Sequence, residues 1–501
     1  MDLPGNLALA FDLALRPGSL LACFAGVLIG TLVGVLPGLG SGTAMALLLP
    51  ATLRMSPTES IIMLSGIYYG TLYGGSTTSI LLNVPGESTS MITCLDGHPM
   101  AKQGRAGVAL GISAIGSFIA GTFSTLMLML LAPLLVGVAI RFGPPEFVAI
   151  TFLGLILVTY LARGALLKAL MMAAVGLLLG CVGLDIMTGE ERFTLGLPKF
   201  MDGIGLMPVM IGLFGISEVL CALEEPFRER EVFKTALRDL LPTRQDIKDS
   251  ALPIGRGTVV GFFLGLIPGG GGLIASLFSY AIEKGISRHP ERFGAGAIEG
   301  VAGPETANNA GGGGSLVPLL TLGIPCNVLM AVLLGALMLH GVAPGPLLMK
   351  EHPELFWGVV GSLYVGNVLL LILNLPLIGV WVQLLRVPYA ILFPLVLLFT
   401  IVGSYSLNNE FGDALIAIGA GVFGYLMRKF EYEPAPLIMA LILGPMFEDS
   451  LRQSLVLSSG GIGIFFTRPL AAVFMGAAML LLASPGILWL CGKKRPGLSD
   501  Y

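Results

Sequence analysis

The sequence predicts an all-α polytopic membrane protein that contains two copies of one broken-helix unit. Three observations support this prediction: the composition, a series of long apolar runs and an internal repeat. Apolar residues occupy 55% of the 501 positions and charged residues only 12%, about half of the roughly 25% found in soluble domains. So few charged side chains cannot cover a soluble chain of this length, whereas apolar side chains can face lipid.

Apolar runs long enough to cross a hydrocarbon core of about 30 Å recur along the chain. The clearest are 107–140, 146–161, 165–182, 204–222, 356–381, 388–407, 412–427 and 466–491. The first of these could form one long helix or two short ones. The sequence therefore predicts a multi-pass protein without fixing the number of crossings.

A glycine motif, GxxxGxxxGxxPGxG, occurs twice at an offset of 231 residues. Its first copy comprises Gly26, Gly30, Gly34, Pro37, Gly38, Gly40 and Ala44, and its second Gly257, Gly261, Gly265, Pro268, Gly269, Gly271 and Ala275. Glycines four residues apart allow two helices to approach closely, and the proline interrupts its helix. A short apolar helix is expected after each interruption, at 43–53 and 273–283.

A second element follows each copy of the motif. Residues 74–78 (GGSTT) precede an NVPG sequence at 83–86, and residues 311–315 (GGGGS) precede a GIPC sequence at 323–326. When Gly75-Ser76 is aligned with Gly314-Ser315, the prolines fall one residue out of step. We interpret both GGS…P segments as helices broken inside the membrane.

Loop charges predict that the two units are inverted. The linker 223–252 holds six basic residues and is expected to be cytoplasmic. Loop 284–292 has three basic residues where its counterpart 51–58 has one, and the bias is reversed between loops 96–106 and 341–353. This arrangement makes 20–53 and 253–283 re-entrant hairpins and places a broken helix in 58–95 and in 295–340.

The chain then divides into four parts. They are the first repeat with the helices that follow it (1–222), the charged linker (223–252), the second repeat (253–387) and the C-terminal transmembrane helices (388–501).

Broken helices at corresponding places in two repeats indicate a transporter's substrate site. Half-helix N-termini attract carboxylates, and freed carbonyls with hydroxyls can hold Na⁺. The substrate-binding candidates are Gly38, Gly40, Ser41, Gly42, Thr43, Gly75, Ser76, Thr77, Thr78, Asn83, Pro85, Gly269, Gly270, Gly271, Asn308, Asn309, Gly314, Ser315 and Pro325. The coupling-ion candidates are Pro37, Pro268, Glu305 and Thr321. For any single glycine, helix packing is the alternative role.

Two carboxylates, Glu305 and Glu87, lie in apolar surroundings in the sequence, which makes each a functional hypothesis. The alternative for either is to cap a helix start. Asp96 is interpreted as part of a structural turn that begins a basic loop. The four histidines lack metal-ligand spacing, no metal other than Na⁺ and no organic cofactor is expected, and a net charge of −3 suggests no nucleic-acid partner.

Enzyme signatures are absent or unconvincing in the sequence. It contains no GxxxxGK[ST], GxSxG or HExxH pattern. A GxGxxG at Gly419, Gly421 and Gly424 lies inside an apolar run without a preceding strand, so we interpret these glycines as helix-packing residues. We therefore expect no enzymatic activity, although an intramembrane enzyme using Glu305 with Asn308 or Asn309 is an alternative.

Several stretches together resemble one known family. They are GTLVGVLPGLGSGTAMALLLP (30–50), YYGTLYGGSTTSILLNVPGE (68–87), DGHPMAKQGRAGVALGISAIGSF (96–118), GLIPGGGGLIASLFSY (265–280) and EGVAGPETANNAGGGGSLVPLLTLGIP (299–325). In these stretches the chain resembles the large membrane subunit of tripartite tricarboxylate transporters, the TctA family. One departure is Cys326, where the family pattern leads us to expect glycine, and this difference could alter the geometry of the second break.

The resemblance implies a permease in the bacterial inner membrane with an elevator-type, inverted-repeat architecture. It also implies two partners, a small membrane subunit and a periplasmic solute-binding protein, and an organic tricarboxylate or dicarboxylate taken up by Na⁺ or H⁺ symport. The alternative is a stand-alone ion channel, or a carrier that works without a binding protein, because the same breaks could line a selectivity filter.

Overall fold

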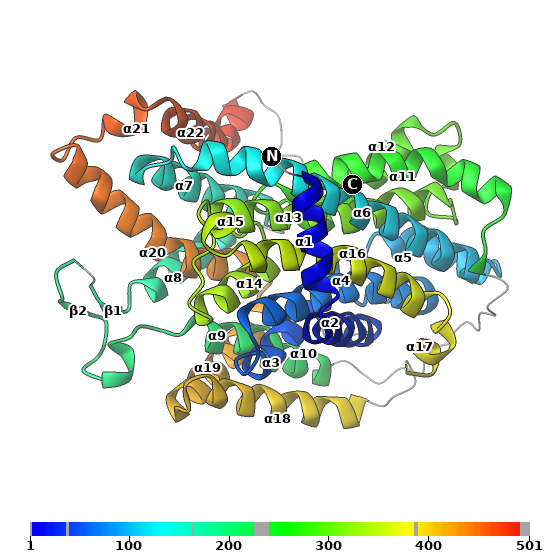
Figure 1. The fold of residues 1–501 in the computed structure, drawn as a ribbon, viewed down its shortest axis with the longest axis horizontal. Helices are drawn as coiled ribbons and strands as arrows, with labels where there is room; N and C mark the ends of the chain where they lie inside the picture. The colour runs from blue at the N-terminus through cyan, green and yellow to red at the C-terminus, as the bar shows by residue number, and fades with distance from the viewer. Residues whose placement is uncertain are drawn as a thin grey trace.

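The structure is a computed structural model that describes residues 3–36, 40–162, 165–185, 187–224, 240–384 and 389–490. Helices make up most of the described chain (Figure 1). The helices of the first half are α1 (Leu3–Ala14), α2 (Pro17–Val35), α3 (Ser41–Thr52), α4 (Pro57–Leu82), η1 (Ser88–Ser90), α5 (Thr93–Lys102), α6 (Ala106–Ala139), α7 (Pro144–Leu161), α8 (Leu166–Gly180), η2 (Pro198–Phe200), α9 (Leu206–Met210), the π-helix η3 (Ile211–Ile216) and α10 (Ser217–Glu224).

The second half is also helical. Its helices are α11 (Arg244–Gly265), α12 (Gly271–Ile286), η5 (Pro290–Arg292), α13 (Glu299–Leu322), α14 (Val328–Leu339), α15 (Leu348–Glu351), α16 (Pro353–Asn374), α17 (Ile378–Leu384), α18 (Tyr389–Asn408), α19 (Phe411–Lys429), α20 (Pro434–Leu457), α21 (Ile464–Thr467) and α22 (Pro469–Leu490). Two short strands, β1 (Gly183–Leu184) and β2 (Glu191–Arg192), pair antiparallel.

Six helices among the described residues are long and apolar enough to cross a bilayer. They are Pro17–Val35, Ala106–Ala139, Pro144–Leu161, Leu206–Glu224, Pro353–Asn374 and Phe411–Lys429. The run 107–140 forms one continuous helix, α6, of 34 residues. Helix α20 is not among these six, and its second half carries Glu448, Asp449 and Arg452. The chain is therefore an all-α polytopic membrane protein.

The two units pack their glycine faces in the same way. A Cβ atom on Gly26 of α2 would lie 2.3 Å from the carbonyl oxygen of Met63 in α4, and one on Gly257 of α11 would lie 2.4 Å from that of Gly303 in α13. Only glycine allows such backbone contact. The pairs α2–α4 and α11–α13 are thus equivalent helix pairs.

These contacts correct the alignment of the second element. Gly26, Gly30 and Gly34 face Met63, Ile67 and Thr71, whereas Gly257, Gly261 and Gly265 face Gly303, Ala307 and Gly311, so α4 and α13 correspond at an offset of 240 residues. At this offset Asn83 aligns with Gly323, and both end their helices in left-handed backbone conformations with φ of 58° and 71°. The prolines Pro85 and Pro325 are then in step.

The glycines of the two GGS…P segments do not interrupt their helices, and the interruption lies at the proline end of each segment. Residues 74–78 are helical within α4, and residues 311–315 are helical within α13. The interruptions come later, between Leu82 and η1 and between Leu322 and α14. Tertiary packing explains the difference, because both segments are buried and glycine lets neighbouring helices approach closely.

The orientation of the units in the bilayer remains a prediction. The first interruption separates α2 from α3, and the second separates α11 from α12, as expected for two hairpins. Helix α2 has 19 residues and is long enough to cross the membrane, so its length alone does not require a re-entrant path. The division into four parts also remains a prediction, and residues 225–239 of the linker lie outside the described residues.

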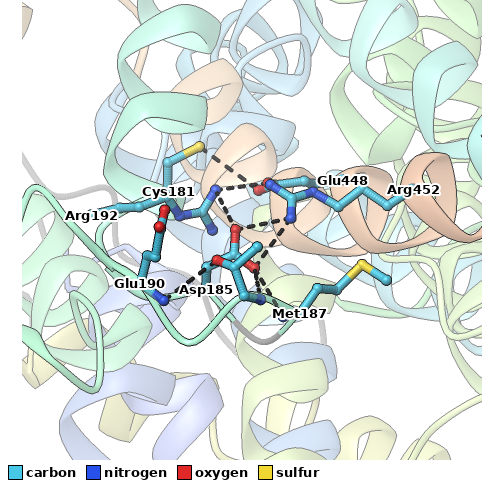
Figure 2. Close-up of polar contacts among 8 residues, drawn as sticks. Cys181, Asp185, Met187, Glu190, Arg192, Glu448 and Arg452 are labelled. Carbon is cyan, nitrogen blue, oxygen red and sulfur yellow. Dashed lines mark hydrogen bonds and ion pairs between the residues drawn. The ribbon is translucent and has the colours of Figure 1, made fainter.

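A hairpin built on β1 and β2 projects from the helical body (Figure 1). A cluster of charges ties its base to α20 (Figure 2). Arg192 pairs with Glu448 at 2.7 Å, and Arg452 pairs with Asp185 at 2.9 Å and with Glu448 at 2.7 Å. We call these four residues the hairpin clamp.

Candidate functional site

Glu305 of α13 lies at the centre of a polar cluster where α4, α5, α6 and α13 meet. Its side chain is 1% exposed. One carboxylate oxygen accepts hydrogen bonds from the hydroxyls of Ser76 and, at 3.1 Å, Ser113; the other accepts from Thr93. The sequences of α4, α6 and α13 contain neither Lys nor Arg. The site thus holds a buried carboxylate among neutral hydroxyl donors.

Asn309 extends this cluster toward α6. Its amide nitrogen donates to the hydroxyl of Ser117 at 2.7 Å and to the carbonyl oxygen of Glu305 at 3.1 Å. Its amide oxygen is buried and has no hydrogen-bond partner among the described residues. Because α13 is glycine-rich, α6 and α11 can approach its backbone closely and bring their polar groups to this level.

Asn308 faces a different element, the start of α12. The side chain is completely buried, and neither atom of its amide has a hydrogen-bond partner within the described ranges. A Cβ atom on Gly272, in the first turn of α12, would lie 2.3 Å from the amide oxygen of Asn308 and 3.3 Å from the methyl carbon of Thr89. The hydroxyl of Thr89 is also buried without a partner in the described chain. Such groups cost about 1–3 kcal/mol each when unsatisfied.

The start of α3 already holds a carboxylate. Glu87 accepts a 2.9 Å hydrogen bond from the backbone N–H of Ser41, the first residue of α3. The hydroxyl of Thr43 donates to the carbonyl oxygen of Phe214 at 2.9 Å. Of the two roles considered for Glu87, helix capping is therefore confirmed, and the capped helix is α3.

The interruption before α12 is shaped by glycines. Gly269 and Gly271 have φ of 80° and 40°, which other residues rarely adopt. No side chain caps α12 at Gly270. Asn327, from the other interruption of the same unit, donates through its amide to the hydroxyl of Ser315 at 3.1 Å.

Several candidates lie apart from Glu305 and Asn308. Thr321 is 16 residues beyond Glu305 in α13, about 24 Å along the helix, and its hydroxyl donates to the carbonyl oxygen of Val317. Thr78 donates to the carbonyl oxygen of Gly34, and Asn83 is exposed.

The other candidates are located as follows. Gly75 and Thr77 lie in α4, Gly314 in α13, Pro85 and Pro325 in the later interruptions, Pro268 before α12, and Gly40 and Gly42 at the start of α3. Pro37 and Gly38 lie outside the described residues.

Sequence reasoning missed Thr93, Ser113, Thr89 and Asn327. Ser113 and Ser117 share one face of α6, and two hydroxyls four residues apart in an apolar run are a usable signal. Asn327 is the counterpart of Glu87 only at the corrected offset, which the packing of α4 and α13 supplies, so no local sequence pattern pointed to it. For Thr93 and Thr89 we find no such signal.

A cavity of about 290 Å³ lies elsewhere, between α8, η3, α19 and α20. Apolar residues such as Leu179, Leu213, Phe423 and Leu437 line it, together with Gly419. A lining of this kind offers nothing to hold a carboxylate. The GxGxxG glycines lie in α19 as expected; Gly421 and Gly424 pack against Ile216 and Leu213, whereas Gly419 faces the cavity.

Comparisons with known proteins identify the family of the chain. Residues 20–439 match the model of the Tripartite tricarboxylate transporter TctA family. The chain is 49% identical over 485 residues, 96% of each chain, to an "Uncharacterized 52.8 kDa protein in TAR-I ttuC' 3'region" of Agrobacterium vitis. It is 48% identical over 220 residues to an "Uncharacterized protein in TAR-II ttuC' 3'region" of the same organism, covering 44% of this chain and 91% of the relative. No solved structure matches the chain. The chain is thus a multi-pass membrane protein that belongs to the tripartite tricarboxylate transporter TctA family.

Proposed function

We propose that this chain is the membrane permease subunit of a binding-protein-dependent secondary transporter. It takes up an organic tricarboxylate or dicarboxylate across the bacterial inner membrane by symport with Na⁺ or H⁺. Its partners are a small membrane subunit and a periplasmic solute-binding protein that delivers the acid. The observation that carries the proposal is the environment of Glu305, a buried carboxylate that the hydroxyls of Ser76, Thr93 and Ser113 hold.

The chemistry of Glu305 supports a role in ion coupling. Hydroxyl hydrogen bonds alone do not neutralise a carboxylate in a low-dielectric site, so the buried group requires a proton or a cation. The hydroxyl oxygens of Ser76, Thr93 and Ser113 can also serve as ligands for Na⁺. Binding of either ion removes the negative charge before an anionic substrate enters.

The repeat supports a moving site between two units. Glu305 belongs to the second unit, and Ser76 belongs to the first, so the coupling group joins the two broken-helix units. We infer that the units are inverted, that the linker is cytoplasmic, and that an elevator-type movement exposes the site to each side in turn. Buried broken helices at corresponding places in two halves support this inference.

Uptake by reconstituted vesicles tests the proposal. Vesicles containing the chain and its small partner subunit, supplied with the cognate binding protein, are offered citrate, tricarballylate, malate and succinate under a Na⁺ gradient and a pH gradient in turn. We expect saturable uptake of at least one acid, driven by one of the two gradients. Large single-channel currents, or equal uptake without the binding protein, would instead support the channel or the stand-alone carrier.

The variant Glu305→Gln tests the coupling role. It keeps the size of the side chain but removes its charge, so gradient-driven uptake should be lost while the folded protein remains in the membrane. Glu299→Gln is the matched control, because Glu299 lies in the first turn of the same helix and is only partly buried. Driven uptake at the wild-type rate in Glu305→Gln would reject this role.

A further inference from the structure

The two short helices α3 and α12 begin at counterpart positions but face different partners. At the offset of the glycine motif, Ser41 corresponds to Gly272. At the offset of the α4–α13 pair, Glu87 corresponds to Asn327. In the first unit the Glu87 carboxylate accepts from the backbone N–H of Ser41 at 2.9 Å. In the second unit the counterpart side chain is neutral.

Asn327 serves a different helix. Its amide oxygen accepts hydrogen bonds of 3.0 Å from the backbone N–H groups of Leu329 and Met330, so it caps α14. Its amide nitrogen would lie 4.0 Å from a Cβ atom on Gly271, so the side chain adjoins the start of α12. The chain thus supplies a carboxylate to the start of α3 and only a neutral amide near the start of α12.

The start of α12 carries the features of an anion site. The first N–H groups of a helix have no partners within the helix and carry partial positive charge. Helix α12 is 16 residues long, its N-cap residue Gly270 has no side chain, and no side chain of the described residues accepts a hydrogen bond from its first turn. The amide of Asn308, completely buried and unpartnered in the described chain, lies against Gly272 in this first turn. The side chain of Thr89, whose hydroxyl has no partner in the described chain, contacts the same turn through its methyl carbon.

We propose that a carboxylate group of the transported acid binds at the first turn of α12. It accepts hydrogen bonds from the backbone N–H of Gly272, the amide of Asn308 and the hydroxyl of Thr89. The substrate thereby makes in the second unit the contact that Glu87 makes in the first. This assignment rests on the proposed function and names the atoms that hold one end of the acid.

The loop that carries Glu87 also places a negative charge close to this site. Glu87 and Thr89 are two residues apart, so their Cα atoms are at most about 7 Å from each other. One of these residues contacts the start of α3 and the other the start of α12. The Glu87 carboxylate therefore repels the carboxylate of the bound acid and lowers its affinity, because two negative charges repel each other across this short distance.

Equilibrium binding to the purified full-length chain in lipid nanodiscs tests the site. The probes are citrate, tricarballylate, malate and succinate. The acid that binds the wild-type chain most tightly is then used with every variant. Asn308→Leu removes the amide but keeps a side chain of the same branched shape, and it should weaken binding at least tenfold. Asn327→Asp keeps an acceptor to cap α14 but adds a charge beside α12, and it should weaken binding by a similar factor. Glu87→Gln should instead tighten binding.

Asn374→Leu is the matched control, since Asn374 is a buried asparagine of α16 whose amide donates only locally, to the carbonyl oxygen of Leu370. Unchanged affinity in Asn308→Leu and Asn327→Asp, or loss of binding in Glu87→Gln, would overturn the assignment of this site. The proposed transport function would not be affected by that result. If Asn308→Leu does not fold, the binding affinity of Asn327→Asp alone tests the site. Failure of the wild-type chain to bind or take up any of the four acids would count against the proposed function itself.

Discussion

The backbone N–H of Gly269 donates a 2.7 Å hydrogen bond to the carbonyl oxygen of Cys326, and this bond joins the two interruptions of the second unit. The Cys326 side chain is completely buried, and its thiol donates to the carbonyl oxygen of Leu266 at 3.4 Å. Cys326 is not among the residues with positive φ. The backbone here therefore accepts a side chain, although the family pattern led us to expect glycine.

Replacing Cys326 with glycine should reduce stability more than transport. The variant Cys326→Gly loses the buried thiol and gains freedom in the unfolded chain, which together should lower the free energy of unfolding by about 1–2 kcal/mol. The bond from Gly269 uses the backbone carbonyl and remains. Thermal unfolding in detergent and vesicle uptake measure the two effects, with Cys326→Ala as the milder control. Loss of uptake at unchanged stability would contradict this prediction.

A second prediction concerns the glycine face of α11. A Cβ atom on Gly261 would lie 2.4 Å from the carbonyl oxygen of Ala307 and 2.6 Å from its Cα atom. Gly261→Ala should therefore force α11 away from α13 and lower the free energy of unfolding by about 1–3 kcal/mol. The measurement is thermal unfolding of the purified protein.

Gly255→Ala is the control in the same helix, because nothing lies within 4 Å of a Cβ atom at that position. Alanine is the better helix former by about 1 kcal/mol, so this variant should be as stable as the wild type or more stable. Equal destabilisation by both variants would mean that helix contact does not explain the glycine motif.

Asp96 provides a third prediction. This residue was interpreted as part of a turn, but it lies within α5 and is fully buried. One oxygen accepts hydrogen bonds from the backbone N–H groups of Gly294, Gly296 and Ala297 at 2.8–2.9 Å, and the other accepts from the hydroxyl of Tyr280 at 2.9 Å. Asp96 therefore fixes the segment that leads into α13.

Asp96→Asn should lower the free energy of unfolding by about 1.5–3 kcal/mol, because the charge that strengthens these bonds is lost. The comparison is Asp202→Asn, at an exposed position. Thermal unfolding of the two variants distinguishes them. Equal stability of Asp96→Asn and the wild type would show that the carboxylate does not hold this segment.

The repeat could be predicted from the sequence because backbone contact between helices requires glycine at every fourth residue. This requirement produces the GxxxGxxxG spacing in the sequence, and Gly26, Gly30 and Gly34 make the expected backbone contacts. The breaks were harder to locate. The low helix propensity of glycine predicts an interruption in segments such as 311–314. Helix α13 nevertheless continues through this segment, because packing against its neighbours outweighs propensity.

The site could be predicted only in part. Glu305 is recognisable as a carboxylate in an apolar segment, but its partners Thr93 and Ser113 are 212 and 192 residues away in the sequence. Contacts over such separations depend on how helices pack, which no local pattern specifies. The role of Asn327 became visible only when the packing corrected the offset of the repeat.

The hairpin clamp gives a final prediction, on pH. Asp185 is 5% exposed and accepts hydrogen bonds from the backbone N–H groups of Met187 and Thr188, besides its ion pair with Arg452 (Figure 2). The backbone hydrogen bond from Met187 is the first cause that holds the pKa of Asp185 below its usual range. A carboxylate with a lowered folded-state pKa contributes stability that is complete above the unfolded pKa of about 3.9. That contribution is lost as pH falls through the folded pKa.

The hairpin should therefore stay ordered from neutral pH down to about pH 4 and loosen only below that value. A nitroxide attached at Leu195→Cys, a position 83% exposed and three residues after the end of β2, reports the mobility of the hairpin by electron paramagnetic resonance. Asp185→Asn should raise the mobility of the hairpin already at pH 7. The further increase in mobility below about pH 4 should then be absent. Glu190→Gln alters an exposed carboxylate of the same hairpin and should change neither. Loosening at pH 5 or above in the wild type would show that a group other than Asp185 controls the clamp.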